Sequence, residues 1–223
     1  EVINLDDLDC VSDWLKDKFD RYLVNKEISE WMLELIDINT EQSVSFAIFL
    51  LGKLFAIHSV EGRYADKKQE AVLGSNDYQA GDFVEENALA LGKKLGLSAV
   101  NLTEQKLKEV LDINRNDKWS NIWRNAIPEH KQNSRQTGAD DIVLKLFRDT
   151  LLGYISEDSD NNANEKLSEL INSNYQTIKR VAIYVASECF EKLEQQVVTL
   201  VIQSNHFNDK YRHELWHFIN KNF

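Results

Sequence analysis

The chain has 223 residues, of which 43% are hydrophobic, and its 26 basic and 37 acidic side chains leave a net charge of −11. The hydrophobic fraction is that of a folded globular protein, and the acidic excess argues against a nucleic-acid-binding protein, which needs a basic face. No apolar run approaches the roughly 20 residues of a membrane helix, and the acidic start EVINLDDLDC does not resemble a signal peptide, so we expect a cytoplasmic protein without membrane contact.

The first 59 residues show the periodicity of helices. A single proline and eight glycines in the whole chain leave few helix breakers. Apolar residues recur at three- and four-residue steps, which predicts helices over three segments: 5–24, 27–37 and 41–59. Asn39 is the expected N-terminal cap of the third helix. Because that helix is apolar nearly all round, neighbouring helices must cover it.

The next part of the chain is predicted to hold an irregular stretch and then two helices. Residues 60–80 contain the turn-forming sequence GSND, which indicates a departure from regular helix packing. Asp82 begins a capping-box pattern for a helix to about residue 95, and Gly96 is placed to end that helix. Thr103 is the expected cap of the following helix, over 104–113.

The C-terminal half begins with an interruption and then becomes regular. Residues 116–138 hold two tryptophans, the single proline and many polar amides, which predicts a long ordered connection. Helices are then predicted over five segments: 140–157, 163–173, 175–192, 194–204 and 208–221. Short turns force consecutive helices to pack antiparallel.

We therefore expect an all-α fold of stacked antiparallel helix pairs, a HEAT-like α-solenoid array with no sheet larger than two short strands. Residues 1–115 and 139–223 would be the two helical parts of one continuous block. The repeat prediction depends on the rhythm of the helices, since no repeating consensus is visible. The helical faces predict eight fully buried side chains: Ile48, Leu51, Leu54, Leu146, Leu151, Ile178, Val185 and Leu215.

The closing stretch RHELWHFINKNF contains the pattern H-E-x-x-H. On a helix, His213 and His217 would lie one turn apart as zinc ligands, and Glu214 could be the base that takes a proton from a bound water. A zinc hydrolase also needs a third protein ligand, and the remaining FINKNF contains no His, Asp or Glu. Both histidines fall opposite the helix face that carries Leu215. We therefore expect no metal site here.

The segment WSNIWRNAIPEHKQN, residues 119–133, is the most individual part of the sequence. It mixes aromatic, cationic and amide side chains, the composition of recognition hot spots, and its candidate partner-binding residues are Trp119, Trp123, Arg124, His130 and Asn133. The same composition also suits a loop pinned onto a helical scaffold, because buried tryptophan and polar side chains need specific partners. Both interpretations stay open.

Three stretches of the C-terminal half resemble one family. They are W-x-x-A-I-x-x-H-x-x-N followed by an acidic loop and KLFRDTLLGYI (residues 145–155), NSNYQTIKRVAIYVASE (residues 172–188), and YRHELWHFINKNF at the end. They resemble the helical-repeat regions that follow the NTPase module in large bacterial STAND-type ATPases, including the Avs antiviral sensors. The resemblance is best over 119–223, and the earlier residues match as generic helical repeats.

The resemblance implies that this chain is a sensing or assembly region of a larger protein. The ATPase and the effector would lie elsewhere in the parent chain, because this sequence contains no phosphate-binding loop. The resemblance also implies that His213 and Glu214 belong to a scaffold signature, R-H-E-L followed by an aromatic residue.

Two functions remain from different classes. The first is a non-catalytic protein-binding region without a cofactor, whose partner is a phage protein or another part of the parent chain, and any oligomer would form through the parent. Residues 1–42 carry 12 acidic against 4 basic side chains, which would steer the chain toward basic protein surfaces and away from nucleic acid. The second is a zinc hydrolase that uses His213, Glu214 and His217.

Overall fold

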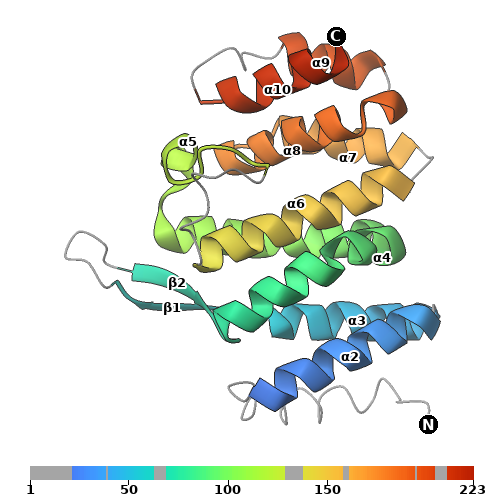
Figure 1. The fold of residues 1–223 in the computed structure, drawn as a ribbon, viewed down its shortest axis with the longest axis vertical. Coiled ribbons are helices and arrows are strands. Elements are labelled where there is room, and N and C mark those ends of the chain that lie inside the picture. Colours follow the sequence, from blue (N-terminus) through green and yellow to red (C-terminus); the bar gives the residue numbers. More distant parts are fainter. Residues whose placement is uncertain are drawn as a thin grey trace.

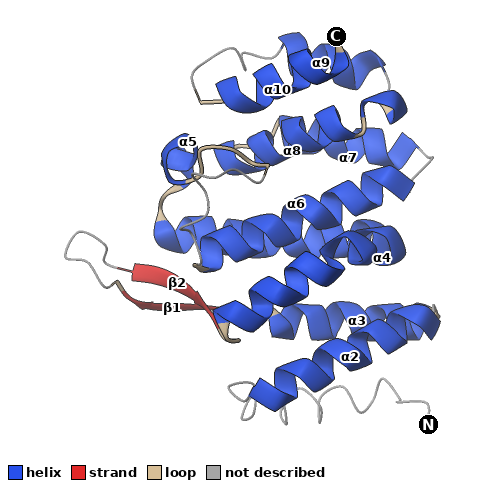
Figure 2. Ribbon diagram, in the orientation of Figure 1, coloured by secondary structure: helices blue, strands red, loops and turns tan. Residues whose placement is uncertain are grey.

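The computed structural model of the chain describes residues 22–38, 40–62, 69–128, 138–157, 161–193, 195–203 and 210–223. This part of the chain is mostly helical and includes a single two-stranded sheet (Figure 2), in agreement with the predicted all-α class. The helix predicted over 5–24 lies outside the described residues except for its last three positions. Among the described helices, none combines the length and the hydropathy needed to cross a bilayer.

The helices are stacked in layers along the longest axis of the molecule (Figure 1). The helices in chain order are α2 (Tyr22–Ile38), α3 (Glu41–Leu54), α4 (Asp77–Asn114), α5 (Ser120–Trp123), α6 (Ala139–Glu157), α7 (Asn161–Ile171), α8 (Gln176–Glu188), α9 (Gln195–Gln203) and α10 (Arg212–Asn222). Helices α2 and α3 form one end, α4 and α6 the middle, and α9 and α10 the other end, with α7 and α8 beneath them. Extensive packing of α4 on α6 joins the two halves of the chain.

A β-hairpin replaces the end of the helix predicted over 41–59. Helix α3 stops at Leu54, and β1 (Ile57–Glu61) pairs antiparallel with β2 (Gln69–Leu73) in a register that sets Ile57 opposite Leu73. The β-branched Ile57 and Val60 suit a strand, and the amide of Gly74 donates to the carbonyl of Ala56 to close the base of the hairpin. The helix prediction was wrong here because a short apolar run fits a strand as well as a helix.

Several predicted helix ends also differ from the structure. Thr40 rather than Asn39 caps α3, through a reciprocal pair of hydrogen bonds with Ser43. Helix α4 is capped by Asn76 rather than Asp82. At Gly96, with φ of 59° and ψ of −141°, the backbone leaves the helical conformation, so α4 consists of two helical segments that meet at a kink, and the first segment ends where Gly96 was predicted to end it. Glycine takes a positive φ at little steric cost, which is why the change of direction occurs at this residue.

A glycine pair lets α4 and α6 cross at very short range. A Cβ atom on Gly92 would lie 1.9 Å from the carbonyl oxygen of Thr150, and a Cβ on Gly153 would lie 2.1 Å from that of Leu89. Both obstacles are backbone atoms, which cannot rotate away as a side-chain end can. The absence of side chains at these two positions therefore sets the spacing of the two central helices.

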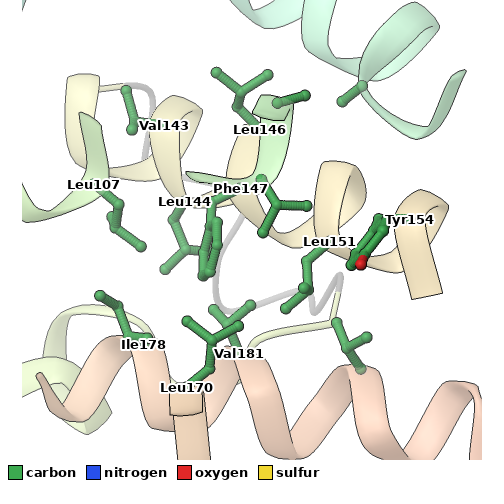
Figure 3. Close-up of a cluster of buried hydrophobic side chains, with 14 of the residues drawn as sticks. Leu107, Val143, Leu144, Leu146, Phe147, Leu151, Tyr154, Leu170, Ile178 and Val181 are labelled. Carbon is green, nitrogen blue, oxygen red and sulfur yellow. The ribbon is translucent and has the colours of Figure 1, made fainter. Parts of the chain in front are cut away.

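The hydrophobic core runs through the whole stack. Figure 3 shows side chains of α6 directed toward α8, with Leu107 of α4 and Leu170 of α7 closing the same cluster. Seven of the eight core predictions are confirmed, since these side chains are buried: Leu51, Leu54, Leu146, Leu151, Ile178, Val185 and Leu215. The prediction for Ile48 was wrong, because this side chain is only partly buried beside the core. Cys189 is a buried free thiol, as expected, and Cys10 lies outside the described residues.

Candidate functional site

The connection after α4 is held against the ends of three helices. It contains a 3₁₀ turn, η2 (Asp117–Trp119), followed by α5. The Asp117 carboxylate accepts hydrogen bonds from the amides of Gln176 and Thr177 at 2.8 and 2.9 Å, so it caps α8 from a distant part of the chain. The indole of Trp123 donates to the carbonyl of Asn116 at 3.2 Å. The segment is thus ordered by contacts that local sequence patterns do not reveal.

Arg124 lies inside the protein, with no exposed surface. Its guanidinium forms an ion pair with Asp141 in the first turn of α6 and donates to the carbonyls of Ala126, at 3.0 Å, and Ile127, at 3.3 Å. A partner cannot reach this side chain while the fold is intact. The prediction of Arg124 as a partner-binding residue is therefore corrected, and its role is to pin the connection to α6.

A second buried arginine joins the connection to α8 and α10. Arg180 directs five hydrogen bonds, one for each guanidinium N–H. Two go to the Glu214 carboxylate at 2.7 and 3.0 Å, and the others go to the Ser120 hydroxyl and to the carbonyls of Arg124 and Asn125. The carboxylate of Glu214 balances the charge of Arg180, and because all five N–H donors are used, the position of the guanidinium is fixed.

The glutamate of the H-E-x-x-H pattern faces the interior. Glu214 is fully buried, and besides the contacts with Arg180 it accepts a hydrogen bond from the amide of Ile127 at 3.2 Å. Both oxygens are thereby engaged by donors from two other parts of the chain. A carboxylate held in this way serves as a structural counter-ion and is poorly placed to take a proton from a water between the histidines.

The two histidines lie on the outer side of α10. His213 has a side chain that is 46% exposed. His217 is half-buried, with Nε2 2.8 Å from a carboxylate oxygen of Glu188 and its ring 5.7 Å from that of Tyr184. Among the described residues, no group of three or more metal-binding side chains is found.

The Glu188 carboxylate is shared between His217 and Lys221, whose Nζ lies 2.7 Å away. Burial acts to raise the pKa of this carboxyl, but the hydrogen bonds and positive charges of its two partners together outweigh burial and lower it. His217 is therefore engaged in a surface ion-pair network that ties α10 to the end of α8.

A cleft of about 520 Å³ opens between the α5 region and α10. We call it the α5–α10 cleft, and it is lined by Asn121, Asn125, Arg180, Lys210, Arg212, His213, Trp216, His217 and Asn220. No acidic side chain is among the described residues that line it, although the chain as a whole carries a charge of −11. The described lining therefore combines cationic, amide and aromatic groups.

Large apolar side chains are exposed in both chain segments that form the cleft. Trp216 in its lining is 55% exposed, and Trp119 and Ile122, which do not line it but neighbour Asn121 in sequence, are 53% and 63% exposed. Large apolar groups at a surface, next to polar hydrogen-bonding side chains, are typical of protein-binding sites.

The structure thus separates the five predicted recognition residues. Trp119 is exposed, Trp123 is partly buried against the core, and Arg124 is buried, whereas His130 and Asn133 lie outside the described residues. Sequence reasoning missed Ile122 and Trp216. Trp216 could have been found, because it follows the buried Leu215 and so falls on a different face of the last helix.

The chain matches no protein-family model, no curated protein and no solved structure.

Proposed function

We propose that this chain is a non-catalytic protein-binding region, a HEAT-like α-solenoid within a larger bacterial protein, and that it binds its partner at the α5–α10 cleft. The observation that carries the proposal is the exposed Trp216 within a hollow lined by cationic and amide side chains, with Trp119 and Ile122 exposed in the same chain segment that contributes Asn121 and Asn125 to the lining. The layered arrangement of the helices supports the solenoid description (Figure 1).

The resemblance to STAND-type ATPases bears on what the parent protein does. The residues of the buried network come from the same stretches that carry the resemblance: Arg124 and Ile127 from W-x-x-A-I, Arg180 from IKRVAIY, and Glu214 from R-H-E-L. On this basis we propose a sensor region in antiviral defence, whose scaffold signature is the network and whose binding surface is the cleft.

No observation favours the alternative zinc hydrolase. Its catalytic base would be Glu214, and both oxygens of that carboxylate already accept hydrogen bonds from Arg180 or the Ile127 amide. The Nε2 atom of His217 is likewise in contact with Glu188.

Site-specific photo-cross-linking in bacterial cells that carry the gene tests the proposal. A photoreactive phenylalanine analogue would replace Trp216 in the cleft or Ile122, which lies next to the lining residue Asn121 in α5. As matched controls it would replace Trp31 on α2 and Tyr78 at the start of α4, two exposed aromatic residues at other places on the surface, 46% and 76% exposed.

We expect the same protein to be captured from Trp216 and Ile122, with the adduct identified by mass spectrometry, and not from the controls. Equal capture from all four positions, or none from the cleft, would overturn the proposal.

A further inference from the structure

The β1–β2 hairpin has two outer edges, and the two differ in how they are covered. Figure 1 shows the hairpin projecting from the side of the helical stack. Strand β2 packs on α4 and α6, where its residues Ala71 and Leu73 are buried. On β1, by contrast, the last four residues, 58–61, are all exposed. The outer edge of β1 is therefore open to a ligand.

The register of the hairpin determines which backbone groups point outward. In an antiparallel pair, hydrogen-bonded and non-hydrogen-bonded residue pairs alternate, and residues of the second kind direct their N–H and C=O away from the neighbouring strand. The amide of Gly74 donates to the carbonyl of Ala56 at 2.9 Å, so these two residues form a hydrogen-bonded pair. Counted along the register from this pair, Ile57, Ser59 and Glu61 direct their N–H and C=O groups away from β2.

The outer edge of β2 follows the same alternation and is closed by a side chain. Ala71, which lies opposite Ser59, donates its amide to Oδ1 of Asn114 at 2.8 Å, and Asn114 is the last residue of α4. No described residue forms a hydrogen bond with the outward backbone groups of Ile57, Ser59 or Glu61. Within the described part of the chain, the edge of β1 thus keeps a row of free donors and acceptors.

The edge of β1 also lacks the features that prevent strands from pairing. Free edges in proteins commonly carry lysine, proline or a β-bulge, or they lie beneath a loop or helix. The strand has the sequence IHSVE, with neither lysine nor proline, and its five residues pair one to one with those of β2, without a bulge. Val60 is β-branched and 40% exposed, so it can pack against a side chain on an added strand. The ligand that complements such an edge is an extended peptide backbone.

Charge decides between a second copy of this chain and a different protein as the source of that backbone. Two copies would each bring a net charge of −11 to the contact, and their repulsion opposes association. The same charge attracts a basic segment. Glu61, the acidic residue of β1, is exposed and forms no ion pair with a described residue, so a lysine opposite it would meet a free carboxylate.

We propose that the outer edge of β1 binds an extended, positively charged segment of a partner protein as a third strand of the sheet. The segment exchanges backbone hydrogen bonds with Ile57, Ser59 and Glu61. A β-branched apolar side chain packs beside Val60, and a basic side chain pairs with Glu61. The α5–α10 cleft shares no residue with β1, so this proposal and the proposed function can fail independently.

The test uses the purified chain and two peptides that differ only in which backbone amides can donate. Both have the sequence lysine–valine–threonine–valine–threonine–valine–lysine. In the first peptide the three valines are N-methylated, which leaves one edge free to pair and prevents the peptide from forming sheets of more than two strands. In the second, the two threonines are N-methylated as well, so both edges are blocked while the side chains and the charge stay the same.

Binding is followed by ¹H–¹⁵N NMR through the amide signal of Ser59 and its rate of exchange with water. We expect the first peptide to slow this exchange at least about ten-fold and to bind at least about ten-fold more tightly than the second, because the second cannot donate to β1. The amide of Ala71 should not change, since Asn114 already accepts its hydrogen bond. A first peptide with glutamate in place of both lysines should bind at least about five-fold more weakly.

A pair of variants at Ser59 tests the edge from the side of the protein. Ser59→Pro removes the central outward donor and keeps the hydrogen bonds between β1 and β2, since proline is tolerated on an edge strand where its nitrogen faces outward. We expect it to weaken binding of the first peptide at least about ten-fold, whereas Ser59→Ala, which keeps the N–H, should bind as the unmodified chain does. If Ser59→Pro does not fold, the comparison of the two peptides on the unmodified chain still decides.

Four results would overturn the proposal. Equal binding of the two N-methylated peptides would show that backbone pairing does not hold the ligand, and equal binding of the lysine and glutamate peptides would remove the preference for positive charge. No change at Ser59 with about 5 mM peptide would exclude strand addition at useful affinity. A chain that dimerises without peptide and thereby protects the Ser59 amide would make a second copy the occupant of the edge.

Discussion

Arg180 of α8 and Glu214 of α10 form a buried, two-point ion pair, with N···O distances of 2.7 and 3.0 Å and almost no exposed surface on either side chain. The same pair holds the connection before α6, because Arg180 also donates to the carbonyls of Arg124 and Asn125 and Glu214 accepts from the amide of Ile127. The glutamate of H-E-x-x-H is thus a structural residue at the junction of three chain segments.

Loss of this pair should unfold the protein rather than remove a catalytic activity. We expect Glu214→Gln to lower the free energy of unfolding by about 3–5 kcal/mol, because it leaves Arg180 buried without its counter-ion. His213→Ala, at a surface site, should change it by less than about 0.5 kcal/mol. Urea unfolding followed by circular dichroism measures both.

Metal content provides a separate check on the H-E-x-x-H pattern. We expect purified protein to hold no stoichiometric zinc after dialysis and its melting temperature to be unchanged by a chelator. One equivalent of zinc that disappears in both His213→Ala and His217→Ala would contradict this and restore the hydrolase hypothesis.

The close crossing of α4 and α6 depends on Gly92 and Gly153. We expect Gly92→Ala and Gly153→Ala each to cost about 3 kcal/mol or more, the upper range for overpacking, because the new Cβ would meet backbone atoms near 2 Å. Gly81 lies in the same α4 helix, and a Cβ added there would meet nothing within 4 Å, so Gly81→Ala should instead stabilise by roughly 0.4–1 kcal/mol. Thermal unfolding of the three variants measures these changes in stability. Equal changes in all three would contradict a close approach at Gly92 and Gly153.

Arg124 and Trp119 should respond in opposite ways to truncation. We expect Arg124→Ala to destabilise the fold by about 3–5 kcal/mol, since Asp141 would lose its buried partner. Trp119→Ala removes a side chain that is 53% exposed and should change stability by less than about 1 kcal/mol while weakening partner capture. A denaturant titration measures the stability of both variants, and the cross-linking yield at Ile122 measures partner capture. A stable Arg124→Ala protein that no longer captures the partner would return Arg124 to the binding site.

Acid should loosen the contact of α4 with α7 through Glu104. Burial acts to raise the pKa of this carboxyl, but hydrogen bonds and charges from Lys108 and Lys166, at 2.6 and 2.8 Å, together outweigh it and lower the pKa below its ordinary 4.5. A lowered folded-state pKa contributes stability that is present above pH 4.5 and is lost as the pH falls through the folded-state value. Glu104→Gln should therefore destabilise the protein at pH 7 by about 1.5–3 kcal/mol and reduce the loss of stability below pH 4.5. An unchanged pH profile in urea unfolding would contradict this role.

Periodicity alone determined the class of the fold and most of its core. Positions such as Leu146, Leu151, Ile178 and Val185 repeat at helical spacing, and burial of an amphipathic face is dictated by the sequence whichever helix covers it. The same helical geometry predicted that the two histidines of H-E-x-x-H lie on the face opposite Leu215. The exposed side chain of His213 agrees with this prediction.

The tertiary structure decided which residues meet across the chain. Arg180 and Glu214 are separated by 34 positions, and Asp117 caps a helix about 60 residues away, so no local pattern pairs them. Whether Gly92 is a weak helix residue or a contact point depends on the α6 helix that packs beside it. Arg124 shows the same dependence. In the sequence, a cation among aromatic residues suits a binding site or a buried ion pair equally well. Only the tertiary structure places Asp141 beside it and buries both side chains.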